Sequence, residues 1–117
     1  DCELRKKDPN KLSTRDIFAA LKKNDPIAIQ VIQEAIEFWG MATANLISIF
    51  NPEKIIFGGG VFDAAAFLLD RIRQEVKRWA QPIAVDQVTI DISKLTSEAG
   101  IYGAAYLALT SLNPKNK

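Results

Sequence analysis

One long helix, whose first half looks half exposed and whose second half has almost no polar face, is the feature that most limits how this chain can fold. The spacing of apolar residues predicts a helix that begins at Asp25 and Pro26 and runs to about Phe50. No charged residue lies between Phe38 and Pro52. A helix that is apolar nearly all round is buried on more than one side, so we expect its second half to be central. One apolar stripe contains Ile27, Val31, Ala35, Phe38 or Trp39, Ala42, Leu46 and Ile49, and a second contains Ile29, Ile32, Ile36, Thr43, Ile47 and Phe50.

Asn45 lies in the half of this helix that we expect to be buried. A buried amide needs a hydrogen-bond partner. A cap on a neighbouring loop is favoured for this side chain, and contact with a ligand stays open.

Only two strands can be predicted in the rest of the chain. The segment 54–57 is apolar after its lysine, and Val88, Ile90 and Ile92 alternate with polar residues, which suits a strand near a sheet edge. A helix capped by Asp63 and closed by Pro82 joins them, so the order of elements predicts a parallel sheet. Two strands can hardly cover helices this apolar. We therefore interpret the chain as part of a larger α/β fold. The apolar stripe of the connecting helix contains Phe67 or Leu68, Ile72, Val76 and Trp79.

The ends of the chain are predicted to differ from its middle. Residues 1–12 are charged and contain a turn signal, which indicates an irregular arriving segment, and residues 113–117 indicate a frayed polar tail. Ser13 and Thr14 cap a short helix that ends at Asn24. A last helix follows Thr96 or Ser97, and its many small residues leave room for close approach of another element. The main unit is thus 13–112.

Composition excludes several classes of function. A chain of 117 residues with 48% apolar content can bury one modest core, which means one domain or part of one. Its net charge of +1 gives no electrostatic reason to expect a nucleic acid or a membrane surface as partner. The basic residues Arg71, Arg73, Lys77 and Arg78 are interleaved with Asp70 and Glu75, so a solvated helix face is favoured over a binding patch.

Cysteine and histidine usage point to a reducing compartment and against an internal zinc site. Cys2 is the single cysteine, so no internal disulfide can form, and the chain has no histidine. No segment near the N-terminus of the given sequence has the residue order of a signal peptide, and the uncharged stretch 38–52 is too short to span a bilayer. We expect a soluble cytoplasmic protein.

Three consecutive glycines, Gly58, Gly59 and Gly60, follow the first strand directly. Backbone without side chains after a buried strand is how α/β proteins bring a phosphate or ribose close to the main chain. A tight turn without a ligand stays open. The dinucleotide motif is weakly supported, because Asp63 stands where its third glycine belongs, and the phosphate-loop motif fails, because Val61 and Phe62 stand where it needs lysine and serine or threonine.

Four segments together resemble the ROK family, a bacterial group of sugar kinases and sugar-responsive repressors. The segment 51–61, NPEKIIFGGGV, resembles the family's adenosine-side motif. Residues 24–28 resemble its Gly-Asp-Pro-x-Ala helix start, with Asn24 in place of the usual glycine. Residues 40–46 resemble its central helix, and 99–105 its closing helix. The resemblance covers roughly residues 14 to 109.

This resemblance implies an α/β fold that is the C-terminal lobe of a ribonuclease-H-like, actin-like ATPase fold. The lobe would be incomplete and helix-rich, with a small parallel sheet. Gly58, Gly59 and Gly60 would bind the ribose and phosphates of ATP. The resemblance implies ATP and Mg²⁺ as cofactors of the full-length protein only. The family's phosphate-binding segment, catalytic aspartate, histidine-containing sugar motif and cysteine-rich zinc motif are absent from this chain, and Cys2 is more simply incidental than a remnant of the last. We assign no catalytic or metal-binding residue here, and expect no kinase activity and no bound cofactor for this chain alone.

Two functions remain open for the full-length protein. One is a glucokinase-like sugar kinase that transfers phosphate from ATP to a hexose, and the other is a sugar-responsive transcriptional regulator of the NagC/XylR type. The intact glycines favour the kinase. The implied partners are the missing N-terminal lobe, a hexose-type sugar and a second copy of the protein, whereas nucleic acid is a partner only if the protein is a repressor.

Overall fold

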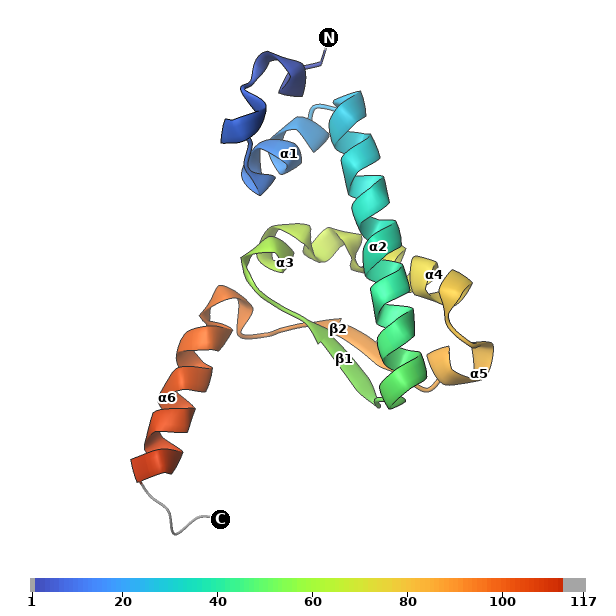
Figure 1. Ribbon diagram of the computed structural model, residues 1–117, viewed down its shortest axis with the longest axis vertical. Coiled ribbons are helices and arrows are strands. Elements are labelled where there is room, and N and C mark those ends of the chain that lie inside the picture. The colour runs from blue at the N-terminus through green and yellow to red at the C-terminus, as the bar shows by residue number, and fades with distance from the viewer. Residues whose placement is uncertain (1, 113–117) are drawn as a thin grey trace.

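A computed structural model describes residues 2–112, in which one long helix runs beside a smaller layer of helices and strands (Figure 1). Thr96 is described by its backbone only. The helices and strands are α1 (Thr14–Leu21), α2 (Pro26–Phe50), β1 (Lys54–Phe57), α3 (Gly60–Ala65), α4 (Leu69–Trp79), α5 (Pro82–Val85), β2 (Thr89–Ile92) and α6 (Ala99–Leu112). Single 3-10 turns lie at Leu4–Lys6, Pro9–Lys11, Ala66–Leu68 and Thr96–Glu98.

The bounds of α2 agree with those predicted from the sequence. The Asp25 carboxylate accepts hydrogen bonds from the backbone N–H groups of Ile27, at 2.9 Å, and Ala28, at 3.3 Å, which is the role of an N-cap. At the other end, Asn51 adopts a left-handed conformation with φ of 42°, and Pro52 follows it. A cap at each end therefore fixes where this helix begins and ends.

The same carboxylate ties the N-terminal segment to α2. The Cys2 thiol donates to Asp25 at 3.1 Å, and the backbone N–H of Glu3 donates at 2.7 Å. Leu4 is buried against Ala20 and Ala28. Cys2 thus has a structural contact that the sequence did not reveal. The proposed boundaries at residues 12 and 113 stay predictions, and the tail predicted for 113–117 lies outside the described residues.

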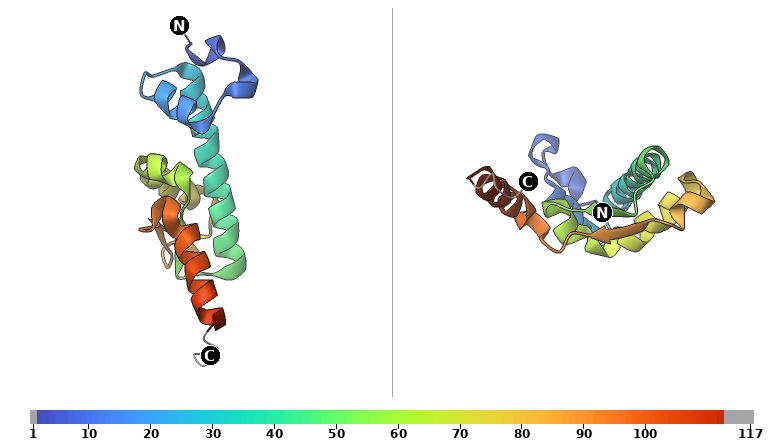
Figure 2. Two further views of the ribbon diagram at one scale, coloured as in Figure 1. Left: turned by 90° about the vertical axis from the view of Figure 1, so that its left-hand side faces the viewer. Right: turned by 90° about the horizontal axis from the view of Figure 1, so that it is seen from below.

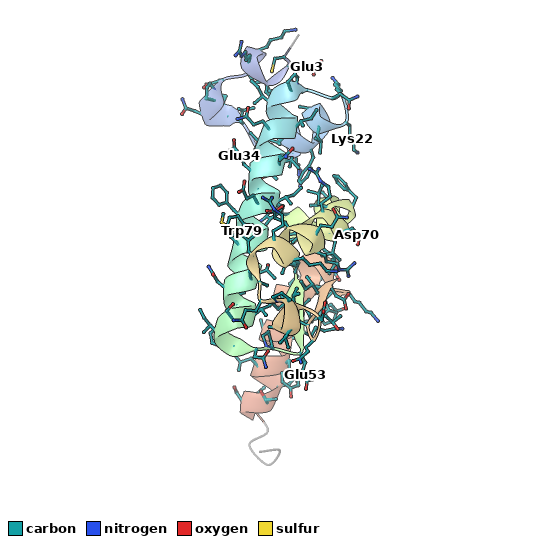
Figure 3. The ribbon with its side chains drawn as sticks, turned by 90° about the vertical axis from the view of Figure 1, so that its right-hand side faces the viewer. Glu3, Lys22, Glu34, Glu53, Asp70 and Trp79 are labelled. Carbon is teal, nitrogen blue, oxygen red and sulfur yellow. The ribbon has the colours of Figure 1, made fainter. Side chains whose placement is uncertain are left out.

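The core lies between α2, α4 and one face of the sheet. Figure 3 draws the side chains on the ribbon. The stripe of α2 that turns inward is the second of the two predicted stripes, with Ile36 4% and Ile47 1% exposed. The first stripe is largely exposed, with Phe38 at 65% and Ile49 at 71%. The expectation that the second half of α2 is central and buried on more than one side is therefore wrong within the described residues, and Asn45 is exposed. The buried cluster contains Phe18, Ile32, Ile36, Ala44, Ile47, Phe62, Ala65, Leu68, Ile72, Val76, Ala80 and Ile90.

The two strands are parallel, as the order of elements predicts. Lys54 is paired with Thr89 and Phe57 with Ile92. The side chains of Ile55, Phe57, Ile90 and Ile92 turn to the core, whereas Ile56 on the other face is 60% exposed. The sheet therefore has one covered face and one open face.

The connection between the strands differs from the single helix predicted. Gly59, rather than Asp63, is the N-cap of α3, and Asp63 lies within the first turn. The 3-10 turn Ala66–Leu68 then separates α3 from α4. Trp79 ends α4, and Pro82 begins the one-turn helix α5. Of the predicted apolar stripe, Ile72 and Val76 are buried, and of the alternatives Phe67 and Leu68 it is Leu68 that is buried. Trp79, by contrast, is 47% exposed.

The last helix stands apart from the rest of the chain. It is separated from α2 in Figure 1 and in the right-hand view of Figure 2, and every side chain from Gly100 to Leu112 is exposed. The chain exposes 8800 Å², against about 6,300 Å² expected for a compact monomer of its mass. Its radius of gyration is 17.9 Å, against about 13 Å for a compact domain of its length. These values describe an open structure.

No helix within residues 2–112 is long and apolar enough to cross a membrane.

Candidate functional site

The three glycines predicted to contact a nucleotide lie at the turn between β1 and α3. Gly58 follows the strand, Gly59 has φ of 87° and ψ of 167°, and Gly60 is the first residue of α3. A positive φ of this kind is open to glycine at no steric cost, so the conformation itself requires glycine at position 59. The glycine segment is therefore a turn of two residues followed by a helix start, not a loop of three residues.

The three glycines differ in how close the neighbouring atoms lie to the position of a Cβ atom. A Cβ atom at Gly58 would meet the Cβ of Ser93 at 3.4 Å, which is ordinary contact. A Cβ at Gly59 or Gly60 would meet no atom within 4 Å. Because Gly60 has neither a positive φ nor a close neighbour among the described residues, nothing in the fold of this chain explains why it is glycine. The open side of the turn has room for a molecule that the chain itself does not supply.

The end of β2 lies beside this turn. The backbone N–H of Ser93 donates to the carbonyl of Phe57 at 2.7 Å, which holds the two strand ends together. Ser93 and Lys94 therefore follow β2 at the same edge where Gly58 follows β1, and this is the edge at which open α/β sheets bind ligands. Sequence reasoning did not select these two residues. The signal that could have found them is the parallel pairing itself, which brings both carboxyl ends together.

A depression of about 530 Å³ runs along the open face of the sheet up to this edge. An ion-paired network crosses it: Asp91 accepts from Lys54 Nζ at 2.9 Å and from an Arg73 guanidinium nitrogen at 3.2 Å. The hydrogen bond and charge of Lys54, with Arg73 adding to them, lower the pKa of Asp91. This carboxylate therefore stays ionised and bound to its two partners. The depression is lined by Lys54, Ile56, Asp91, Ile92, Ser93, Lys94 and Leu95.

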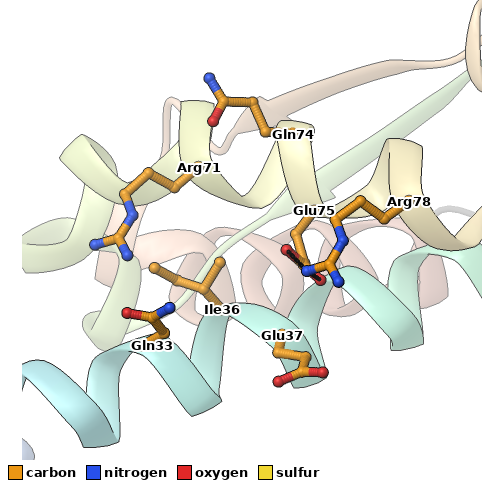
Figure 4. Close-up of a pocket in the computed structure, with 7 residues that line it drawn as sticks. All are labelled: Gln33, Ile36, Glu37, Arg71, Gln74, Glu75 and Arg78. Atoms are coloured by element: carbon orange, nitrogen blue, oxygen red, sulfur yellow. Dashed lines mark hydrogen bonds and ion pairs between the residues drawn. The ribbon is translucent and has the colours of Figure 1, made fainter.

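A second depression, of about 270 Å³, lies between α2 and α4 (Figure 4). Its charged side chains have both signs, and Arg78 is already bound to Glu75 by two hydrogen bonds at 2.9 and 3.0 Å. The Trp79 indole N–H also donates to Glu75, and this hydrogen bond, together with the hydrogen bonds and charge of Arg78, lowers the pKa of that carboxyl. Arg73 is likewise paired, with Asp70 at 2.8 Å. These pairs fit the solvated helix face predicted for this segment, and we do not interpret the depression as a binding site.

Within the part of the chain that the structure describes, no group of three or more histidine, cysteine, aspartate or glutamate side chains could hold a metal ion. The candidate site therefore consists of backbone at the glycine turn, the end of β2 and the open face beside them.

Comparison with known proteins agrees with this architecture. The sequence model of the ROK family matches residues 3–111, almost the whole chain. The chain belongs to the ROK family. A glucokinase from Halalkalibacterium halodurans is 35% identical over 91% of this chain and 32% of its own length. A xylose repressor from Caldicellulosiruptor bescii is 26% identical over 82% of this chain and 24% of its own.

A solved structure gives the fold of this ROK chain. The ROK-family transcriptional regulator described as a homologue of the E. coli MLC protein superposes with a TM-score of 0.68, at 33% identity over 85% of this chain and 25% of that one. The prediction of part of an actin-like ATPase fold with a small parallel sheet is thereby confirmed. The chain spans about a third of the length of the glucokinase that it matches.

Proposed function

We propose that this ROK chain is the C-terminal part of a glucokinase-like sugar kinase, to which it contributes the adenosine side of an ATP site. The observation that carries the proposal is the turn at Gly58–Gly60, which lies at the carboxyl edge of a parallel sheet and leaves space at two of its glycines. The 35% identity with a glucokinase, against 26% with a xylose repressor, favours the kinase. The acceptor would be a hexose, and the dependence on ATP supports a cytoplasmic location.

The residues present suit part of a nucleotide site but not a catalytic centre. The open backbone at Gly59 and Gly60 lets a ribose or phosphate approach the main chain, and Lys94 at the same edge supplies a positive charge. Phosphoryl transfer also needs Mg²⁺ and a group that orients the acceptor hydroxyl. The described residues hold no cluster of metal ligands, so we infer that these parts come from the remainder of the polypeptide.

We further propose that α6 and the open face of the sheet are covered by the N-terminal lobe of the same protein. Nothing charged interrupts α6, and its large side chains are exposed by half or more. A helix of this composition is normally buried. The relatives are about three times as long as this chain, which provides a lobe large enough to cover it.

A glycine substitution separates ligand contact from folding. We expect Gly60→Leu in the complete gene product to raise the KM for ATP at least about tenfold, because the side chain fills the space that the proposal gives to the nucleotide. The melting temperature should stay within about 2 °C, since no neighbour is crowded and φ is not positive. The measurement is a coupled assay of glucose phosphorylation with ATP varied, together with thermal unfolding.

Gly59→Ala is the matched control. It forces a Cβ onto a backbone with φ of 87°, so it should lower the melting temperature whether or not a ligand binds. An unchanged KM for ATP in Gly60→Leu would contradict the assignment of the turn to the nucleotide.

A sugar-responsive regulator is the second candidate, and the 33% identity with a ROK transcriptional regulator of solved structure supports it. A regulator would bind a sugar without phosphorylating it and would carry a helix-turn-helix for the DNA major groove. Purified complete gene product that binds glucose in calorimetry but forms no ADP in the assay would favour this candidate over the kinase.

A further inference from the structure

The outer edge of β2 carries backbone groups that point away from its partner strand. The N–H groups of Thr89 and Ser93 donate to carbonyls at either end of β1, at 2.9 and 2.7 Å. Successive residues of a strand alternate in direction, so the N–H and C=O groups of Ile90 and Ile92 point outward. A row of outward backbone groups is a template on which another chain can add a strand.

A cleft of about 250 Å³ borders this edge and would favour such an addition. Three of its side chains are apolar, and they could pack against alternate side chains of an extended segment. When a peptide adds a strand to a sheet edge, main-chain hydrogen bonds supply the affinity and pockets of this kind supply the specificity. An unprotected β2 would therefore attract an extended segment. The cleft is lined by Arg73, Lys77, Val85, Asp86, Val88 and Ile90.

Arg73 of α4 occupies this edge. Its Nε donates to the carbonyl oxygen of Ile90 at 3.0 Å, and one of its terminal nitrogens donates to the same oxygen. A carbonyl oxygen has two lone pairs, so these two bonds leave no place for the N–H of an added strand. β2 spans only Thr89–Ile92, so Ile90 provides one of the two outward carbonyls that a further strand would use.

The guanidinium group of Arg73 is held from both sides of the edge. The helix that carries it packs on the covered face of the sheet. The same terminal nitrogen that binds the Ile90 carbonyl also donates to Asp91 at 3.2 Å, and the Asp91 carboxylate lies on the open face, where it is paired with Lys54. The other terminal nitrogen donates to Asp70 of α4 at 2.8 Å. The side chain therefore passes around β2 from one face to the other, and charge-assisted hydrogen bonds hold it there.

The edge of β1 is not closed in this way. Within residues 2–112, no side chain donates to the outward carbonyls of Lys54 and Ile56. We propose that Arg73 blocks the outer edge of β2, so that a strand from a second copy of this protein cannot pair with it and the sheet can extend only beside β1. Natural proteins protect edge strands with charged side chains, and here the charge also fills the backbone acceptor. This inference does not depend on the proposed activity.

The first experiment compares two arginines of α4 in the complete gene product. Arg73→Met keeps an unbranched side chain but removes every donor at the β2 edge. Arg78→Met loses the same charge at a residue whose guanidinium donates to Glu75 and reaches no strand. By sedimentation velocity, Arg73→Met should form species larger than those of the wild type, with association at least about tenfold tighter, because the bonds that fill the Ile90 carbonyl are lost. Arg78→Met should change association less than about threefold. Wild-type behaviour of Arg73→Met, or an equal effect of Arg78→Met, overturns the proposal.

The second experiment separates strand addition from loss of folding in Arg73→Met. Amide hydrogen exchange, resolved by residue in the associated variant, should be slower than in the wild type at Ile90 and Ile92, because an added strand accepts from their outward N–H groups. Exchange at Thr89 and Ser93 should stay as slow as in the wild type, since their N–H groups donate to β1. Faster exchange at Thr89 and Ser93 would show that the variant unfolds. Unchanged exchange at Ile90 and Ile92 would show that it associates through another surface, and either result overturns the proposal.

Discussion

α4 and α6 occupy equivalent places in the chain, because each follows one strand of the same parallel sheet. α4 buries Ile72 and Val76 completely and turns a charged face to solvent, where Arg73 and Arg78 are paired. α6 has no charged residue, and beyond Ala99 it buries none of its side chains. The helix with a charged face, α4, is the one that buries its apolar side, and the helix without charged residues, α6, is the one that remains exposed.

The difference shows how the sequence of a helix indicates where its partners lie. A helix with one apolar stripe and one charged face has all its partners on one side, and α4 finds them in α2 and the sheet. A helix without a polar face needs partners on several sides, and this chain does not supply them for α6. We therefore interpret α4 as having all its packing partners within this chain. The partners of α6 would come from the remainder of the full-length protein.

The largest expected effect comes from truncating one side chain in each helix of the 117-residue chain. Ile72→Ala, at a position that is 0% exposed, should lower the free energy of unfolding by about 2–5 kcal/mol. Leu107→Ala, at 67% exposure, should change it by less than about 0.5 kcal/mol. Urea denaturation followed by circular dichroism measures both. Equal losses in the free energy of unfolding would show that α6 packs on the rest of the chain as α4 does, which would contradict the difference drawn between the two helices.

The two substitutions Ile72→Ala and Leu107→Ala should also be compared in the complete gene product. There the cost of Leu107→Ala should rise to about 2 kcal/mol or more, because the proposed N-terminal lobe buries that side chain. A cost that stays below about 0.5 kcal/mol would contradict the proposal that this lobe covers α6.

Two helical glycines should respond with opposite signs. A Cβ at Gly40 of α2 would lie 2.5 Å from Cγ and 2.8 Å from Cβ of Glu75, so Gly40→Ala should destabilise the chain by about 1–3 kcal/mol. A Cβ at Gly103 of α6 meets nothing within 4 Å, so Gly103→Ala should stabilise the isolated chain by up to about 1 kcal/mol through helix propensity. Thermal unfolding of both variants beside the wild type measures these changes. A stabilising Gly40→Ala would mean that α2 and α4 are not in close contact.

Sequence reasoning succeeded where one local signal dominated. Asp25 with Pro26 and Asn51 with Pro52 fixed the bounds of α2, because caps and proline act within a few residues. The parallel sheet followed from the order of elements. The family was identified by four motifs in register, and the family match over residues 3–111 confirms it.

It failed where the outcome depends on which neighbours are present. Both apolar stripes of α2 have helical spacing, and periodicity alone could not tell that the Ile32 and Ile36 stripe turns inward. Asp63 is a good cap by type, but Gly59 has the conformation that starts α3 earlier. At the candidate site the sequence selected Gly58, Gly59 and Gly60, whose nucleotide contact stays a prediction. It missed Ser93 and Lys94 because their proximity arises only from strand pairing.

The smallest expected effect is a fall of the melting temperature at low pH. We expect it to arise from carboxyls outside α6, above all Asp25. Burial alone would raise the pKa of Asp25, but hydrogen bonds from Cys2 and from the backbone N–H groups of Ala28, Leu4 and Ile27 together lower it from 3.8 to about 2. A carboxyl with a depressed pKa stabilises the folded state above its unfolded pKa, and this contribution is lost as the pH falls through the folded value. The melting temperature of the 117-residue chain should therefore decline between about pH 4 and pH 2.

Asp25→Asn tests whether this carboxyl is responsible. The variant should melt roughly 4–8 °C lower at pH 6, the order expected for a weakened helix cap, and should show a shallower decline between pH 4 and pH 2. α6 contains no carboxylate, so Leu107→Ala should leave the slope of the decline unchanged. If Asp25→Asn declines as steeply as the wild type, the acid sensitivity belongs to other carboxyls such as Glu75 and Asp91, whose pKa values are also lowered by their partners, Trp79 and Arg78 for the first and Lys54 and Arg73 for the second. Either slope locates the acid-sensitive contacts outside α6, because α6 has no carboxylate that titrates in this range.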